Sequence, residues 1–219
     1  MATIPSQEYR DTHYTGRALS FAIGESTAEA VCGLAAIVVA IVGLANPEWT
    51  ILTPIATILA SAALVFAGAT ACSRCMASSA PLPSTTEREM EAGMSAEILG
   101  GIAGVVLGIL AILGLAANLL VSIAIIVFGA SLLLGSMATV SFRSMATAEG
   151  GAGTHYGVSM ARGSHVLFGL ATIILGIVAL VGEAQYGPIL NLVGLLVVGA
   201  GVLMTATAFA RRLMGGLVR

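Results

Sequence analysis

The chain has 219 residues, of which 58% are hydrophobic and only 9% are charged, and its formal net charge is −2. A soluble domain usually has about a quarter of its residues charged, so this composition excludes an ordinary soluble domain. The small net charge and the lack of a basic cluster also exclude a nucleic-acid partner.

The first 17 residues are polar and contain acids as well as Arg, and the N-terminus lacks the basic start and short apolar core of a cleaved signal peptide. We therefore expect a cytoplasmic N-terminal segment, and we expect the first apolar span to act as its own insertion signal. Six apolar stretches follow, near residues 27–45, 51–73, 96–115, 119–141, 164–182 and 188–210. Each is too long for a buried strand and lacks the alternation of a barrel strand. The sequence thus predicts an all-α polytopic membrane protein with six transmembrane helices.

One apolar phrase occurs three times at a spacing of 68 residues, beginning at Gly33, Gly101 and Gly169. Each unit then closes with an Arg-x-Met, which begins at Arg74, Arg143 and Arg212. A constant offset with small residues in phase indicates three tandem two-helix repeats. We expect a pseudo-threefold arrangement of these hairpins, with the odd-numbered helices as the inner ones.

The predicted organisation follows from these boundaries. It consists of an N-terminal segment at 1–26, helical hairpins at 27–76, 95–145 and 163–214, cytoplasmic linkers at 77–94 and 146–162, and a tail at 215–219. Both linkers are rich in Ser, Thr, Gly and Pro, so we expect them to be flexible connections rather than folded domains.

Charge predicts the orientation in the membrane. All nine Arg residues lie outside the six apolar stretches, in the termini or between the last stretch of one hairpin and the first of the next, whereas the turns within hairpins contain Glu48 and Glu183. By the positive-inside rule both termini and both linkers are cytoplasmic, as in a multi-pass protein of the inner (plasma) membrane. We expect Trp49, in the first turn, to be an interfacial anchor.

Small residues are expected to hold the helices together, because the hydrophobic effect contributes little between helices in lipid. The candidate packing residues are Gly33, Gly101, Gly104, Gly108, Gly169 and Gly176. The alternative is that these glycines line a groove for a ligand.

Three titratable residues, Glu29, Glu97 and His165, stand four positions before the aligned glycines. At equivalent depth in three symmetric helices they would converge at the cytoplasmic mouth, where they could sense or relay protons. The alternative is capping, because residues 26–29 read as a capping box and a carboxylate in a first turn complements the helix dipole.

Cys72 and Cys75 form a CxxC, and Cys32 lies at similar depth on the preceding helix. Three thiols in one hairpin could hold a metal or a redox switch. They could equally be small apolar filler, since the cytoplasm keeps thiols reduced. A Thr-His-Tyr tripeptide occurs at residues 12–14 and again at 154–156, which chance alone readily produces. We predict no cofactor and no metal centre.

The segment "VGLANPEWTILTPIATILASAALVFAGATACSR" has an apolar helix, an Asn-Pro turn, and a second helix that ends in small residues and an Arg. It resembles the short repeat of HdeD-type membrane proteins. The resemblance implies a six-helix inner-membrane protein linked to acid resistance, with no catalytic residues to carry over. The Asn-Pro turn occurs only in the first hairpin.

The expected function is therefore non-enzymatic. The chain has no phosphate-binding loop, no HExxH and no G-x-S-x-G motif. We expect a structural or stress-related protein surrounded by membrane lipids that acts as a homo-oligomer or as a subunit of a membrane complex. One alternative is a proton or small-solute channel or carrier gated at the Glu/Glu/His cluster, and another is a lipid or quinone binder. A continuous polar path along the axis would favour conduction, whereas a dry axis would favour the structural role.

Overall fold

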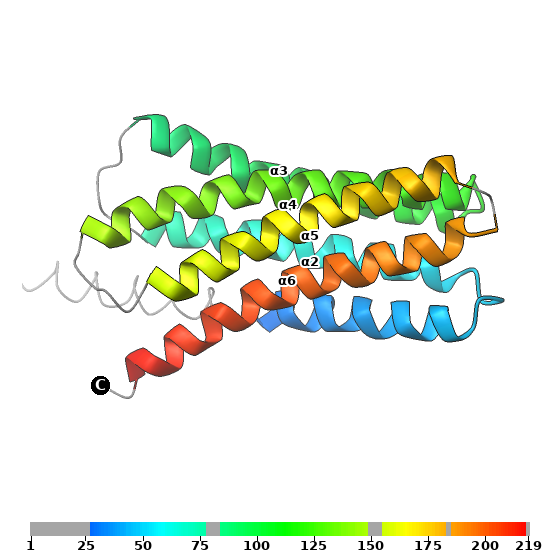
Figure 1. Cartoon of the computed structure of the whole chain (residues 1–219), viewed down its shortest axis with the longest axis horizontal. Helices are drawn as coiled ribbons and strands as arrows, with labels where there is room; N and C mark the ends of the chain where they lie inside the picture. The colour runs from blue at the N-terminus through cyan, green and yellow to red at the C-terminus, as the bar shows by residue number, and fades with distance from the viewer. Residues whose placement is uncertain (1–26, 78–83, 149–154, 183–184, 218–219) are drawn as a thin grey trace, which may run out of the picture.

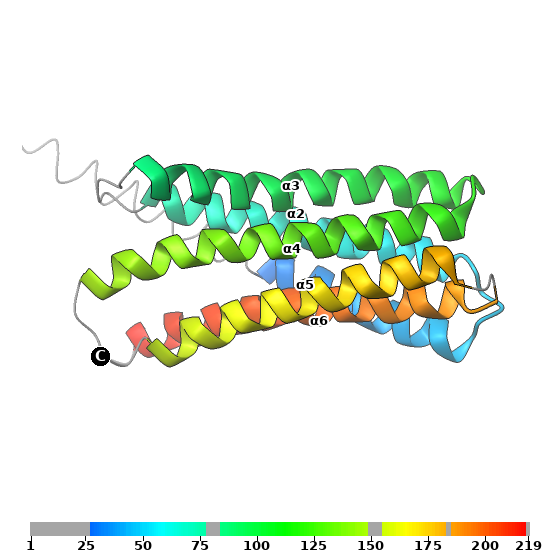
Figure 2. The ribbon, with the colours of Figure 1, turned by 45° about the horizontal axis from the view of Figure 1, so that its top comes forward.

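The computed structural model describes residues 27–77, 84–148, 155–182 and 185–217, and the regular structure in these ranges is helical. The helices are the first helix Thr27–Ala45, α2 Leu52–Ala77, α3 Ser84–Ile112, α4 Ala117–Ala148, α5 His155–Val181 and α6 Gly187–Leu217. They run in alternating directions in one elongated bundle (Figures 1 and 2). We call the end where α2, α4 and α6 begin the turn end, and the opposite end the far end.

The described helices are apolar over lengths that match a bilayer. Five of them are long and apolar enough to cross a membrane, whereas the apolar part of α5, His165–Val181, is shorter. A bilayer core of about 30 Å requires roughly 20 helical residues, with a range of about 17 to 25. The chain is thus an all-helical, multi-pass membrane protein.

Several helices extend into the segments that we expected to be flexible. The helix α3 begins at Ser84, within the expected linker 77–94, and α5 begins at His155, within the linker 146–162. Likewise α4 continues to Ala148 and α6 to Leu217. Apolar residues mark only the part of a helix that lies in lipid, and the start of α3 is rich in Glu, Arg and Met, which are good helix formers in water.

Neighbouring helices pack in sequence order, and the bundle closes on itself. Each of α2 to α6 packs against the next, and α2, α4 and α6 also contact one another. The first helix lies against α6, since a Cβ placed on Gly33 would be 3.5 Å from the carbonyl oxygen of Gly199. The even-numbered helices are therefore the inner ones, contrary to our expectation for the odd-numbered helices.

The side chains explain this order. The large side chains that are fully buried belong to the even-numbered helices, led by Leu64 on α2, Phe128 on α4 and Leu195 on α6. The odd-numbered helices instead bury small residues and expose branched ones at matching positions. The exposed positions include Leu34, Ile102 and Leu170, then Val38, Val106 and Ile174, then Ile41, Ile109 and Ile177. In a bilayer this face meets lipid, which the even-numbered helices largely avoid.

The spacing of buried residues differs between the two helix sets. Along the odd-numbered helices the 68-residue offset holds throughout, as at Gly33, Gly101 and Gly169. On the even-numbered helices Leu64 corresponds to Leu132 at 68 residues, but Leu132 corresponds to Val202 at 70 residues. The third hairpin thus has two extra residues between its aligned glycine and the buried face of α6.

The turn after α3 is closed by a glycine in a left-handed conformation. Gly114 has a φ of 82°, its N–H donates to the carbonyl of Ala111 at 3.1 Å, and the N–H of Leu115 donates to that of Leu110 at 3.2 Å. This pair of hydrogen bonds is a Schellman motif, which satisfies the last carbonyls of the helix. Ala116 also has a positive φ, of 40°, so the connection to α4 is tight.

Candidate functional site

Glu29, Glu97 and His165 are all buried, with exposed fractions of 3%, 6% and 5%. They lie on the three odd-numbered helices, each one turn before a buried glycine. Because residues four apart share a helix face, each of these side chains lies on the same side of its helix as that glycine. Three titratable groups therefore occupy equivalent places inside the bundle, towards the far end.

Glu97 lies directly against α4. A Cβ placed on Gly135 would overlap the carboxylate of Glu97, so the absence of a side chain at Gly135 makes room for this group. The sequence analysis did not single out Gly135. The 68-residue offset aligns Gly135 with Ala67, another small residue, but it does not reveal the contact with Glu97.

His165 is buried without a hydrogen-bond partner among the described residues. Both ring nitrogens are buried, and neither forms a hydrogen bond in the part of the chain that the structure describes. Leaving a buried polar group unpaired costs about 1–3 kcal/mol. The unpaired imidazole is therefore expected to lower the stability of the bundle.

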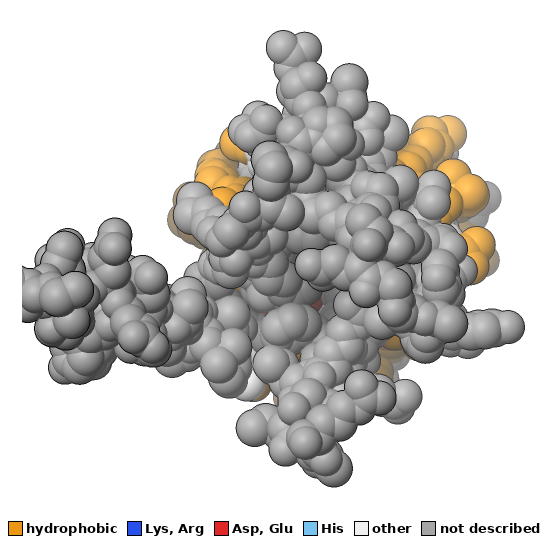
Figure 3. Space-filling view, turned by 90° about the vertical axis from the view of Figure 1, so that its left-hand side faces the viewer, with side chains coloured by type: hydrophobic (Ala, Val, Ile, Leu, Met, Phe, Trp, Pro, Cys, Tyr) orange, Lys and Arg blue, Asp and Glu red, His pale blue; other side chains and the backbone are white. Residues whose placement is uncertain are grey.

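The far end of the bundle shows acidic atoms at depth. Figure 3 views that end, and acidic side-chain atoms are visible near its centre. Among the described residues, no group of three or more His, Cys, Asp or Glu side chains could hold a metal ion. The structure buries Glu29, Glu97 and His165 at matching positions but does not gather them into a metal-binding cluster.

An apolar core fills the middle of the bundle. It consists mainly of side chains from α2, α4 and α6, and Phe128, Ile125 and Leu195 are each 0% exposed. The buried hydroxyls of α2 bond within their own helix, with Thr57 donating to the Thr53 carbonyl at 2.9 Å and Ser61 to the Thr57 carbonyl at 2.6 Å. Such local bonds satisfy a hydroxyl without forming a path for water.

A polar contact links α4 to α6 near the turn end. The Ser122 hydroxyl donates to Oδ1 of Asn191 at 2.9 Å, and the amide of Asn191 donates to the Asn118 carbonyl at 3.2 Å. Asn191 is fully buried. The sequence analysis missed this pair because the change from a 68- to a 70-residue offset conceals which residues of α4 and α6 correspond.

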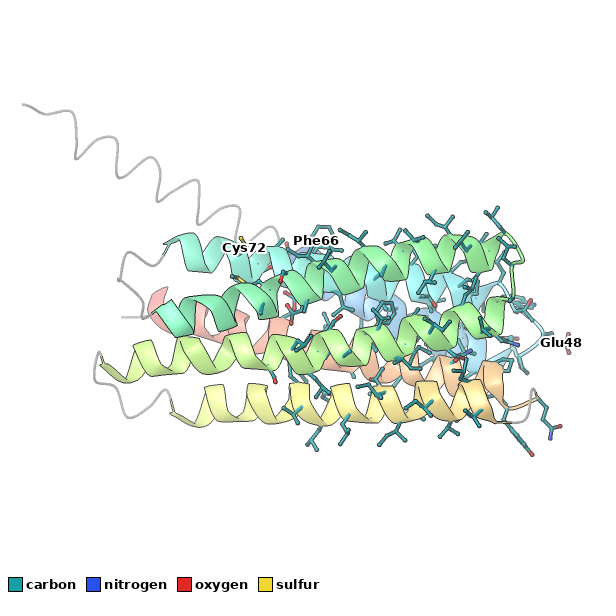
Figure 4. The ribbon with its side chains drawn as sticks, turned by 90° about the horizontal axis from the view of Figure 1, so that it is seen from above. Glu48, Phe66 and Cys72 are labelled. Atoms are coloured by element: carbon teal, nitrogen blue, oxygen red, sulfur yellow. The ribbon has the colours of Figure 1, made fainter. Side chains whose placement is uncertain are left out.

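A cavity of about 300 Å³ opens at the turn end. It lies between the first turns of α2, α4 and α6 and the end of the first helix, and its lining includes Leu44, Trp49, Thr53, Asn118 and Leu192. Among the described residues that line it, none carries a charged side chain. Glu48 belongs to the adjoining turn but points away from the bundle (Figure 4).

The six candidate glycines are all buried, and none of them lines the cavity. Each lies against a neighbouring helix. A Cβ on Gly101 would be 2.7 Å from the Ser61 carbonyl oxygen, and one on Gly169 would be 2.8 Å from that of Gly129. Gly104, Gly108 and Gly176 likewise lie against side chains of α4 or α2. These contacts favour helix packing over a ligand groove.

The thiols occupy less central places. Cys32 packs at the edge of the apolar core, and Cys72 lies near the far end of α2, one helix turn and a half beyond Phe66 (Figure 4). Both are free cysteines. The side chain of Cys75 and the Thr-His-Tyr side chains lie outside the described residues, so a shared role for these groups stays a prediction.

Comparison of the chain with protein-family models, with curated proteins and with solved structures finds no match.

Proposed function

We propose that the chain is a non-enzymatic inner-membrane protein with a structural or stress-related role, and that it acts through membrane partners or self-association. This proposal includes six membrane spans, three hairpins around a pseudo-threefold axis and cytoplasmic termini. It also includes the HdeD-type link to acid resistance that the sequence resemblance implies.

The observation that carries the proposal is the apolar core. Phe128, Ile125 and Leu195 are fully buried between the titratable groups and the cavity at the turn end. A dry core of this kind disfavours conduction of protons or ions, which need polar groups or water at close intervals. The closed ring of helix contacts and the matching buried positions on the odd-numbered helices support the threefold arrangement.

A flux assay tests the non-conducting role. The purified protein in liposomes with an internal pH dye should give no proton flux above that of empty vesicles, with an uncoupler as positive control. Flux that is lost in Glu97→Gln but kept in Glu48→Gln would contradict the proposal. Glu48 is the matched control because it is exposed and lies at the opposite end from Glu97.

Partner binding and acid resistance need separate tests. Cross-linking in mild detergent should capture oligomers or a defined partner, and deletion of the gene should lower survival of the native host in acid. Labelling of single cysteines at positions 48 and 88, in a cysteine-free background, should place them in opposite compartments. Labelling from the same compartment would contradict the orientation.

A second candidate is a proton-responsive channel or carrier gated at Glu29, Glu97 and His165. It is favoured by the burial of all three groups and by the unpaired nitrogens of His165. Under the leading proposal, Glu97→Gln and His165→Ala should restore acid survival to a deletion strain as well as the wild type does. Failure of both variants, at normal protein levels, would favour the second candidate.

A further inference from the structure

His165 lies on the face of α5 that packs between α4 and α6. About one turn further along α5, Gly169 lies against Gly129 of α4, and Phe168 lies against Gly201 of α6. Residues three and four positions apart share one face of a helix, so the imidazole is directed between the same two helices. It is 5% exposed, and neither ring nitrogen has a hydrogen-bond partner in the part of the chain that the structure describes.

The helices packed against this ring contain no acidic residue. Helix α5 lies beside α4 and α6 (Figures 1 and 2). The ionisable residues in the sequences of α4 and α6 are Arg143, Arg211 and Arg212. Helix α5 itself adds His155, Tyr156 and Arg162. A protonated imidazole at position 165 therefore has no counter-charge on its own helix or on either neighbouring helix.

The two buried carboxylates reach this region from other helices. Glu97 lies on α3 and contacts α4 at Gly135, whereas Glu29 lies on the first helix, which packs against α6 through Gly33. Neither carboxylate accepts a hydrogen bond from His165, because both nitrogens of the imidazole are unpaired. The histidine thus differs from its two aligned residues in charge type as well as in its surroundings.

Acid changes the balance at this position. An imidazole in water binds a proton near pH 6.5, and burying the unpaired charge that results costs far more than burying the neutral ring. The apolar part of α5 begins at His165, so a short outward movement of this end of the helix brings the ring to water. The close contact between Gly129 and Gly169 lies one turn nearer the turn end, where it forms a natural fulcrum.

We propose that acid opens the bundle at the far end, with protonated His165 driving α5 away from α4 and α6 while the turn end stays packed. This inference goes beyond the proposed function, because it concerns a change of shape and not proton flux or acid survival. Each opening takes up one proton, so the ratio of open to closed molecules should rise by up to about tenfold for each pH unit below about 6.5. Above that pH the ring is neutral in both forms, and the ratio should not depend on pH.

Three lipid-facing positions report the opening. Val31, Leu99 and Leu167 are aligned at the 68-residue offset on the first helix, α3 and α5, and their exposed fractions are 66%, 65% and 69%. Spin labels are placed pairwise at these positions in a cysteine-free form of the full-length protein, in nanodiscs of zwitterionic lipid that expose both ends. Between about pH 7.5 and about pH 5, both distances to position 167 should lengthen, while the distance from 31 to 99 should stay constant.

A second pair of labels tests where the bundle opens. Leu113 and Val181 are also 68 residues apart, are exposed, and lie at the turn end of α3 and α5. The distance between them should not change with pH, because the proposed movement is confined to the far end. This pair therefore distinguishes a hinged opening of α5 from a general expansion of the bundle.

Substitutions identify the group that takes up the proton. His165→Gln keeps a polar side chain and His165→Leu removes it, and neither variant titrates, so both should give the same distances at the two pH values. His155→Gln is the matched control, because it removes the other histidine of α5 and should leave the response as in the wild type. Glu97→Gln should also respond as the wild type does.

The contrary results are equally clear. Unchanged distances at about pH 5, or lengthening that persists in both variants of His165, would overturn the proposal. Shortening of the distances to position 167 would show that the carboxylates of Glu29 and Glu97 attract the protonated ring instead. Loss of the response in Glu97→Gln would assign it to the carboxylate. These distances are independent of proton flux and acid survival, so the failure of either proposal leaves the other standing.

Discussion

Replacing Gly101 by alanine should destabilise the protein, whereas the same change at the aligned Gly33 should not. A Cβ at position 101 would lie 2.7 Å from the Ser61 carbonyl oxygen and 2.9 Å from the backbone nitrogen of Val65. These are backbone atoms, so the clash is relieved only if α2 and α3 move apart. At position 33 the nearest atom is the Gly199 carbonyl oxygen, at 3.5 Å, which is an ordinary contact.

The expected magnitudes follow from this geometry. Overpacking of a close interface costs about 1–3 kcal/mol, and a separation of roughly 0.5–1 Å already forfeits a quarter to a half of each contact's dispersion energy. Against this, alanine is favoured over glycine within a helix by up to about 1 kcal/mol. Gly101→Ala should therefore lower the free energy of unfolding by about 1–2 kcal/mol, while Gly33→Ala should leave it unchanged or raise it slightly.

Reversible unfolding in mixed micelles, followed by circular dichroism, measures both variants against the wild type. Val65→Ala should rescue Gly101→Ala only in part, because it removes the contact with the Val65 side chain but not those with the backbone. Equal effects at positions 33 and 101, in either direction, would refute the reasoning, since the two sites are matched in sequence and differ in local spacing.

Three further predictions use the same unfolding measurement. Gly114 and Ala116 both have positive φ, which glycine adopts more readily than alanine. Gly114→Ala should therefore lower the free energy of unfolding by about 1–2 kcal/mol, although no atom lies within 4 Å of the added Cβ, and an unchanged free energy would contradict the Schellman geometry. Ala116→Gly should instead raise the free energy of unfolding by up to about 1 kcal/mol. Asn191→Leu should cost about 0.5–2 kcal/mol through loss of the α4–α6 hydrogen bonds, and a stabilised variant would show that these bonds contribute nothing. His165→Leu should raise the free energy of unfolding by about 1–3 kcal/mol by removing two unpaired nitrogens, whereas a loss of stability would reveal a partner for the imidazole.

The helical, membrane-spanning character could be read from the sequence because it depends on apolar length alone. The aligned glycines also indicated which face of each odd-numbered helix is buried, since small residues allow close approach. The ends of α3 and α5 were not predictable in the same way. Hydropathy reports where lipid begins, and a helix continues past that point wherever the sequence favours it.

The identity of the inner helices was hidden for a different reason. Both helix sets are uniformly apolar, so hydrophobicity does not distinguish a face that meets lipid from one that meets protein. The difference lies in side-chain volume across a three-helix contact, as where Gly104 lies against Phe128 of α4 and Ser61 of α2. Such complementarity appears only once the register of all three helices is known.

The candidate site was foreseeable in part. Glu29, Glu97 and His165 share a register, which pointed to equivalent burial, but nothing in the sequence revealed that Gly135 leaves room for Glu97 or that the imidazole is unpaired. The cavity at the turn end is formed by segments of all three hairpins. Its donors and apolar wall come together only in the folded bundle.

The contact between Gly33 on the first helix and Gly199 on α6 has a consequence for biogenesis. The ribosome makes these two helices first and last, so the small-residue face of the first helix has no permanent neighbour until the final hairpin emerges. During that interval Glu29, which lies on the same face, would be presented to hydrocarbon or to the insertion machinery, and a carboxyl group in hydrocarbon is costly. Nascent chains arrested before residue 187 should therefore remain attached to membrane chaperones or be degraded, and release should coincide with the arrival of α6.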